Sequence, residues 1–112
     1  MDTDSLSISP AELAARMARG DAPLVLDVRR DVRFAESDKI LPHAQRCDPD
    51  EVAQYARTQP KGEVVVYCVH GLEIGQNAAE QLRAAGWNAR FLQGGIEGWA
   101  EAGLPTARKD PA

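Results

Sequence analysis

The most constraining feature of this chain is an apolar segment that leads a cysteine into a glycine-containing turn and then a helix. Residues 64–67 form a continuous β-branched and aromatic run, typical of a strand covered on both faces of a parallel sheet. Good helix formers follow over residues 76–85. Their apolar stripe recurs every fourth residue, at Ile74, Ala78 and Leu82. Cys68 is therefore predicted between the carboxyl end of a central strand and the amino end of the next helix.

This predicted position favours a reactive role for Cys68. Ligands of open α/β sheets bind at the carboxyl ends of the strands, and the positive end of a helix stabilises a nucleophilic thiolate. Gly71 lets the turn adopt backbone angles closed to other residues, so that several N–H groups can surround one anion. A lone cysteine is often only a small core residue. The order of strand, cysteine, glycine turn and helix favours the nucleophile here.

Size and composition predict one globular domain. The 112 residues are 44% hydrophobic and 27% charged, which suffices for one core and leaves no room for a second domain. The net charge of -4 favours neither nucleic acid nor an anionic membrane as a partner. No apolar stretch could span a bilayer and residues 1–5 do not resemble a signal peptide, so a cytoplasmic location is expected. Two cysteines far apart, Cys47 and Cys68, predict no disulfide framework, and no metal or organic cofactor is expected.

Strand and helix signals alternate along the chain, which predicts a parallel sheet with helices on both faces. Strands are expected at residues 6–8, 24–28, 42–46, 64–67 and 87–92. Helices are expected after the capping residues Ser9 and Asp48 and over 76–85 and 96–102, with a single turn at 32–36. Residues beyond 106 are expected to form a flexible tail.

Charged residues follow the second apolar strand. Asp27 would be costly in a core without partners, so we expect it to accept hydrogen bonds and hold the neighbouring loops near the site. Arg29 is placed with Asp27 as support for the site. Arg30 is expected to be a solvated arginine.

Five motifs resemble those of a single rhodanese domain in order and spacing. They are Leu26-Asp27-Val28-Arg29, Leu41-Pro42-His43-Ala44, Val66-Tyr67-Cys68-Val69-His70-Gly71, Leu92-Gln93-Gly94-Gly95 with Trp99, and Gly103-Leu104-Pro105. The resemblance covers residues 5–106 and leaves 107–112 as the tail. It implies a rhodanese-like α/β fold, in which a central parallel sheet of about five strands carries helices on both faces.

The same resemblance implies a sulfurtransferase with a six-residue active loop that begins at Cys68. Cys68 would take a sulfane sulfur from a small donor such as thiosulfate and hold it as a persulfide. A thiol, a cyanide-like acceptor or a protein would then receive the sulfur. The loop amides would bind the anionic groups, with Leu72 as a wall of the pocket. These substrate-binding residues are Val69, His70, Gly71, Leu72, Glu73 and Ile74.

Two positions depart from the pattern of the rhodanese family. Glu73 stands where the loop often carries an arginine. A carboxylate directed inward at about 5 to 6 Å would repel the sulfur by roughly 3 kcal/mol, whereas one directed outward from the first helical turn would do little harm. We expect the outward orientation and a poor reaction with thiosulfate, because the arginine is missing. His43 replaces the usual glycine of the second motif.

Several other polar and aromatic residues each allow two interpretations of their role. His70 either contacts a donor or is an exposed loop residue, and the sequence favours neither. Cys47 is expected to be structural rather than to resolve the persulfide as an internal disulfide. Trp87 and Trp99 are expected to pack rather than to bind substrate.

Two further functions share parts of this pattern. A cysteine phosphatase needs an arginine after cysteine and five further residues, but that position is Ile74, so this function is discounted. A catalytically weak rhodanese-like binding or regulatory module would retain the fold and Cys68 without productive binding of donors at Glu73. A sulfur adduct on Cys68 distinguishes the sulfurtransferase from this module.

Overall fold

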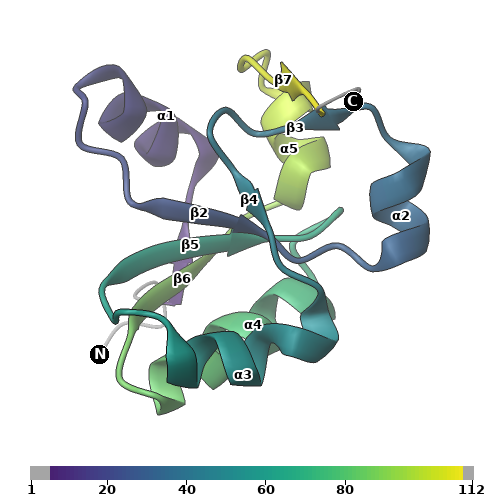
Figure 1. Ribbon diagram of the computed structural model, residues 1–112. Coiled ribbons are helices and arrows are strands. Elements are labelled where there is room, and N and C mark those ends of the chain that lie inside the picture. Colours follow the sequence, from purple (N-terminus) through teal and green to yellow (C-terminus); the bar gives the residue numbers. More distant parts are fainter. Residues whose placement is uncertain (1–5, 110–112) are drawn as a thin grey trace.

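A five-stranded parallel sheet with helices on both faces forms the centre of the computed structural model, which describes residues 6–109 (Figure 1). The strand order is β1 (Ser7–Ile8), β6 (Asn88–Leu92), β5 (Glu63–Tyr67), β2 (Leu24–Asp27) and β4 (Gln45–Arg46). Every neighbouring pair is parallel. Residues 64–67 of β5 are buried because strands flank β5 and helices cover both faces, as their apolar run predicted. The predicted α/β architecture is confirmed.

Two hydrophobic cores lie on opposite faces of the sheet. Helices α1 (Pro10–Ala18) and α5 (Gly95–Glu101) cover one face, and α3 (Val52–Thr58) and α4 (Glu73–Ala84) cover the other (Figure 1). Both tryptophans are buried, Trp99 in the first core and Trp87 in the second, which confirms that they pack. None of the helices within residues 6–109 is long and apolar enough to cross a membrane.

Local capping signals set where several helices begin. The Ser9 hydroxyl accepts a hydrogen bond from the Glu12 N–H at 3.1 Å, as the capping box predicted. The Asp48 carboxylate accepts one from the Asp50 N–H at 2.8 Å and starts a 3₁₀ turn, η2 (Pro49–Glu51), which continues into α3. Helix α4 begins at Glu73 rather than at the predicted residue 76, because the chain turns into the helix immediately after Gly71, at φ +72°.

The carboxyl end of the described chain is a strand, which corrects the prediction of a tail from residue 107. Strand β7 (Ala107–Arg108) pairs antiparallel with β3 (Lys39–Ile40). The Lys109 N–H donates to the Asp38 carbonyl at 2.9 Å, and its ammonium group lies 4.1 Å from the centre of the Phe34 ring. These partners are distant in sequence, so the local polarity of residues 106–112 did not reveal them. Residues 110–112, and residue 5 at the predicted domain start, lie outside the described part.

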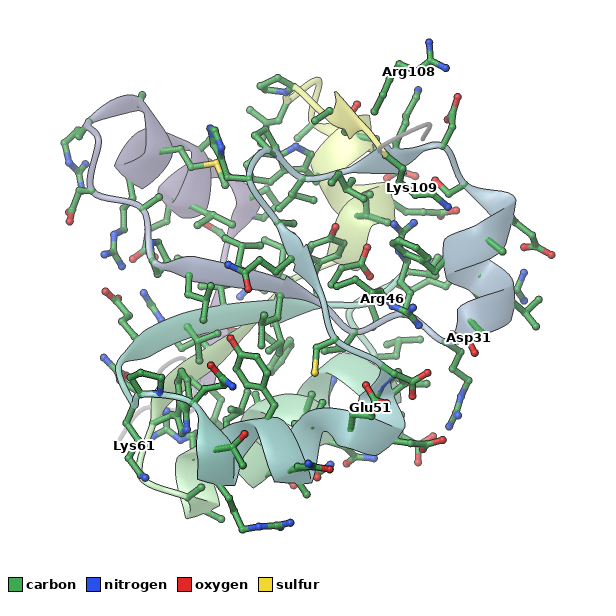
Figure 2. The ribbon with its side chains drawn as sticks, viewed as in Figure 1. Asp31, Arg46, Glu51, Lys61, Arg108 and Lys109 are labelled. Carbon is green, nitrogen blue, oxygen red and sulfur yellow. The ribbon has the colours of Figure 1, made fainter. Side chains whose placement is uncertain are left out.

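Helix α2 (Asp31–Glu36) lies at the edge of the sheet where β2 and β5 end (Figure 1). Lys109 holds it from the carboxyl-terminal strand, and its side chain bonds to the Phe34 carbonyl. From β4, Arg46 donates to the Arg29 carbonyl at 2.8 Å and to the Asp31 carboxylate at 2.9 Å. Figure 2 shows Arg46 and Asp31 together on this side of the molecule, with Lys109 near α2. The segment between β2 and α2 is therefore fixed from two other elements.

Candidate active site

Cys68 directly follows the central strand β5 and opens onto a cavity of about 260 Å³. Only 6% of the residue is exposed, and its sulfur packs against the first turn of α4. A Cβ added to Gly75 would lie 3.3 Å from the Cys68 Sγ. Cys68 is buried but lines this cavity, and it belongs to neither apolar core.

Main-chain contacts hold the active loop on the β6–α5 turn. The Cys68 and Val69 carbonyls accept hydrogen bonds from the N–H groups of Ile96 and Glu97 at 2.9 and 3.0 Å. Gly95, at φ +62°, lies so close that a Cβ there would meet the Val69 carbonyl oxygen at 2.4 Å. Gly71 packs equally tightly, with its hypothetical Cβ 2.6 Å from the Gly94 nitrogen. Glycine is required at both positions because two backbones meet there at positive φ.

The amides of the active loop have no hydrogen-bond acceptor in the part of the chain that the structure describes. Among residues 6–109, no N–H group of residues 69–75 donates a hydrogen bond to another protein atom, and none donates to the Cys68 Sγ. The first bonded amide is that of Gln76, which donates to the Leu72 carbonyl at 3.1 Å. A run of free N–H groups therefore follows the cysteine, available to an anion bound beside it.

Five charged or titratable side chains line the cavity beside Cys68. They are Arg29, Arg30, Arg33, His70 and Glu73. Three of them have acidic partners of their own: Arg29 pairs with Asp27, Arg33 lies 3.3 Å from the Glu36 carboxylate, and His70 Nδ1 lies 3.3 Å from the Glu97 carboxylate on α5. The His70 side chain is 57% exposed. His70 thus lines the cavity, as a residue that contacts a donor would. Its side chain is also exposed and contacts α5, as a loop residue without that role would.

Arg30 and Glu73 are the charged cavity residues that have no ion-pair partner among the described residues. Both are exposed, and neither forms an ion pair with any residue among 6–109. Arg30 was expected to be a solvated residue, and the structure adds that it lines the cavity of Cys68. Glu73 is exposed on the first turn of α4, where the helix dipole stabilises a carboxylate.

A buried ion pair supports the cavity from below. The Arg29 Nη2 donates to the Asp27 Oδ2 at 2.6 Å, the Arg29 main-chain N–H donates to the Oδ1 at 3.0 Å, and both residues are buried. The Tyr67 hydroxyl donates to the Asp27 Oδ2 at 3.0 Å and accepts from the Leu41 N–H at 3.2 Å. Burial, together with the Asp27 carboxylate, raises the pKa of Tyr67 well above its usual value, so the hydroxyl remains a donor. The prediction that Asp27 accepts hydrogen bonds at the strand end is confirmed.

Cys47 lies two strands away from Cys68. It follows β4 as Cys68 follows β5, and Val28 of the intervening strand separates them in register. Two strand spacings amount to roughly 10 Å, too far for a disulfide without backbone movement. Burial raises the pKa of the Cys47 thiol, and the nearby Glu51 and Asp48 carboxylates raise it further. These features support a structural thiol rather than a partner for a persulfide.

Comparison with known proteins identifies the family. The family model described as "Rhodanese-like domain" matches residues 9–102. This chain belongs to the rhodanese-like domain family. That family includes sulfurtransferases.

Several known proteins resemble this rhodanese-like domain in sequence or in structure. An uncharacterized protein of Synechocystis is 31% identical over 109 residues, which cover 93% of this chain but 57% of that protein. The chain thus spans just over half the length of this curated relative. A rhodanese-related protein from Thermoplasma volcanium has a TM-score of 0.78 and 26% identity, covering 92% of this chain and 98% of that one. A thiosulfate sulfurtransferase from Pseudomonas aeruginosa has a TM-score of 0.75 and 26% identity, covering 94% of this chain and 20% of that one.

Sequence reasoning missed several residues of the rhodanese-like site. Arg30 just before α2, Arg33 on α2 and Glu97 on α5 reach the site only because segments distant from Cys68 in sequence meet there, which no local pattern shows. Gly75 did carry a signal. It is a glycine in a helix with no capping role, and such a residue indicates close approach of another group.

Proposed function

We propose that this rhodanese-like domain is a sulfurtransferase that carries a sulfane sulfur as a persulfide on Cys68. One observation supports this most strongly. Cys68 opens onto a cavity next to a run of loop amides, residues 69–75, that have no acceptor among the described residues. Such donors stabilise a sulfur anion or a donor's oxyanion, whereas a structural cysteine has no need of them.

The reaction requires two sulfur transfers and no net oxidation. The Cys68 thiolate attacks the sulfane sulfur of a donor such as thiosulfate, a new S–S bond forms, and the donor's own S–S bond breaks. The electron pair leaves on the donor fragment, which for thiosulfate is sulfite; in mercaptopyruvate the bond that breaks is C–S, and the pair leaves on the pyruvate enolate, which takes up a proton. An acceptor thiolate, cyanide or a protein thiol then attacks the outer sulfur and releases Cys68 as a thiolate. Asp27 and Arg29 hold the cavity floor during both steps.

A catalytically weak binding or regulatory module is the second candidate function. It is favoured by Glu73, whose carboxylate lines the cavity and opposes the approach of a dianion. The low exposure of Cys68 also favours the binding module, because a donor reaches a buried sulfur more slowly.

Sulfur loading distinguishes these two functions. The protein is incubated separately with thiosulfate, mercaptopyruvate and polysulfide, and its intact mass is measured. We expect the mass of one added sulfur in the native protein and in Cys47→Ser, and no addition in Cys68→Ser. Failure of every donor to add sulfur to the native protein would favour the binding module. Hydrolysis of an aryl phosphate would instead revive the phosphatase, against which Ile74 argues.

A further inference from the structure

We propose that Arg30 and Glu73 form a two-charge site that selects zwitterionic, amino-acid-type sulfane donors over compact dianions. This inference rests on the proposed function and names its substrate class. In it, the Arg30 guanidinium binds the α-carboxylate of the donor and the Glu73 carboxylate binds its α-ammonium group. The sulfane sulfur of the same molecule faces Cys68.

The position of the two charges supports this site. Arg30 and Glu73 both line the cavity of Cys68 and also a neighbouring cavity of about 390 Å³ along α4. They therefore stand where the two cavities meet. The second cavity continues past the side-chain amides of Asn77 and Gln81, which can bond the polar groups of a longer, peptide-like donor.

The charges of the cavity support it independently. Three other basic groups line the same cavity, and each has its own acid: Arg29 with Asp27, Arg33 with Glu36 and His70 with Glu97. Arg30 and Glu73 have no such partner among residues 6–109 and do not pair with each other. A cavity that keeps one cation and one anion apart is complementary to a ligand carrying both charges. A dianion would gain from Arg30 and lose to Glu73.

The transfer from such a donor balances as the thiosulfate reaction does. The Cys68 thiolate attacks the outer sulfur of an amino-acid persulfide, and an S–S bond forms at Sγ as the donor's S–S bond breaks. The electron pair leaves on the amino-acid thiol sulfur, which takes up the persulfide proton. No oxidant or reductant is needed.

Three donors that differ only in their end groups test the two-charge site. They are cysteine persulfide, its N-acetyl derivative, which lacks the ammonium group, and its ethyl ester, which lacks the carboxylate. The measurement is the rate of sulfur addition to Cys68 in single-turnover mass spectrometry. We expect cysteine persulfide to react about fivefold faster than either analogue, the upper end for an exposed ion pair.

Substitutions assign each preference to one residue. Glu73→Gln should make cysteine persulfide and the N-acetyl donor equal, while the ester stays slower. Arg30→Gln should make cysteine persulfide and the ester equal, while the N-acetyl donor stays slower. Glu80→Gln, on the same helix, and Arg57→Gln are exposed controls away from both cavities and should keep the native pattern.

The outcomes separate this inference from the proposed function. Rates that follow net charge, with the ester fastest and the N-acetyl donor slowest, would show only a general field from Glu73 and overturn the two-charge site. Equal rates for the three donors would overturn it as well, while leaving the sulfurtransferase intact. If no donor loads Cys68 in the native protein, the proposed function itself fails.

Discussion

Cys68 and Cys47 occupy matching places in the fold but opposite chemical surroundings. Each directly follows a parallel strand, β5 or β4, at the same edge of the sheet, and each keeps 6% of its surface exposed. Cys68 is followed by a run of amides with no acceptor among residues 6–109, and it lines a cavity rich in basic residues. Cys47 is followed by a capped 3₁₀ turn whose acids, with burial, raise the pKa of its thiol.

The comparison shows that burial alone does not determine what a cysteine can do in this protein. The backbone after each cysteine makes the difference. Gly71 turns the chain so that the loop amides stay unbonded, whereas Asp48 caps its own turn and adds negative charge beside Cys47. On the proposed function the first arrangement holds an anion beside Cys68, whereas the acids of the second raise the pKa of Cys47.

Asp27 is common to both cysteine regions, so its loss should have the largest effect. Its carbonyl accepts the Cys47 N–H at 2.9 Å, and its carboxylate holds Arg29 under the cavity of Cys68. Asp27→Asn would leave the Arg29 charge buried without a counter-ion. We expect the free energy of unfolding to fall by about 4 kcal/mol in urea titration. Asp31→Asn, which removes an exposed partner of Arg46, is the control and should change stability little; equal losses would contradict the role of burial.

Gly71→Ala should break the Cys68 region alone. The new Cβ would meet the Gly94 nitrogen at 2.6 Å and would force a side chain to φ +72°. We expect a loss of about 3 kcal/mol in unfolding free energy and no sulfur on Cys68. Gly20→Ala is a matched control at φ +76° with open space around it, and should lose only about 1 kcal/mol. A similar loss in both variants would mean that the loop does not pack tightly on the β6–α5 turn.

His43→Gly should stabilise the chain segment that leads into Cys47. His43 has φ 64°, the left-handed conformation that glycine adopts without strain, and this explains why the family motif usually has glycine at this position. We expect a gain of about 0.5 to 1 kcal/mol in thermal unfolding, with sulfur loading of Cys68 unchanged. His43→Ala keeps the strain and should give no gain, so a gain there would assign the effect to loss of the imidazole.

Glu51→Gln should make the Cys47 thiol slightly more reactive, and so reduce its expected difference from Cys68. The Glu51 carboxylate helps to raise the pKa of Cys47, so its removal lowers that pKa and leaves more thiolate at neutral pH. We expect Cys47 to be alkylated about twofold faster at pH 7, with its pH profile moved to lower pH. Glu101→Gln, an exposed change on α5, is the control. An unchanged profile would mean that burial and Asp48, without Glu51, hold the pKa of Cys47 high.

The sequence predicted the features that depend on residues close together in the chain. The run at 64–67, the capping box at Ser9 and the glycine turn at Gly71 led to the parallel sheet, the helix starts and the place of Cys68. It did not predict the features that depend on contact between segments distant in sequence. Strand β7 needs the edge of β3, and the pairing of His70 with Glu97 needs the active loop beside α5.

The central claim is that backbone surroundings, not exposure, make Cys68 the reactive thiol. Its most direct test is iodoacetamide labelling of the native protein at neutral pH, with the rate at each cysteine followed by peptide mass spectrometry. The two cysteines have the same exposed fraction, so a difference in their labelling rates reflects their surroundings. We expect Cys68 to react at least about tenfold faster than Cys47. Labelling of Cys47 at an equal or greater rate would contradict the claim.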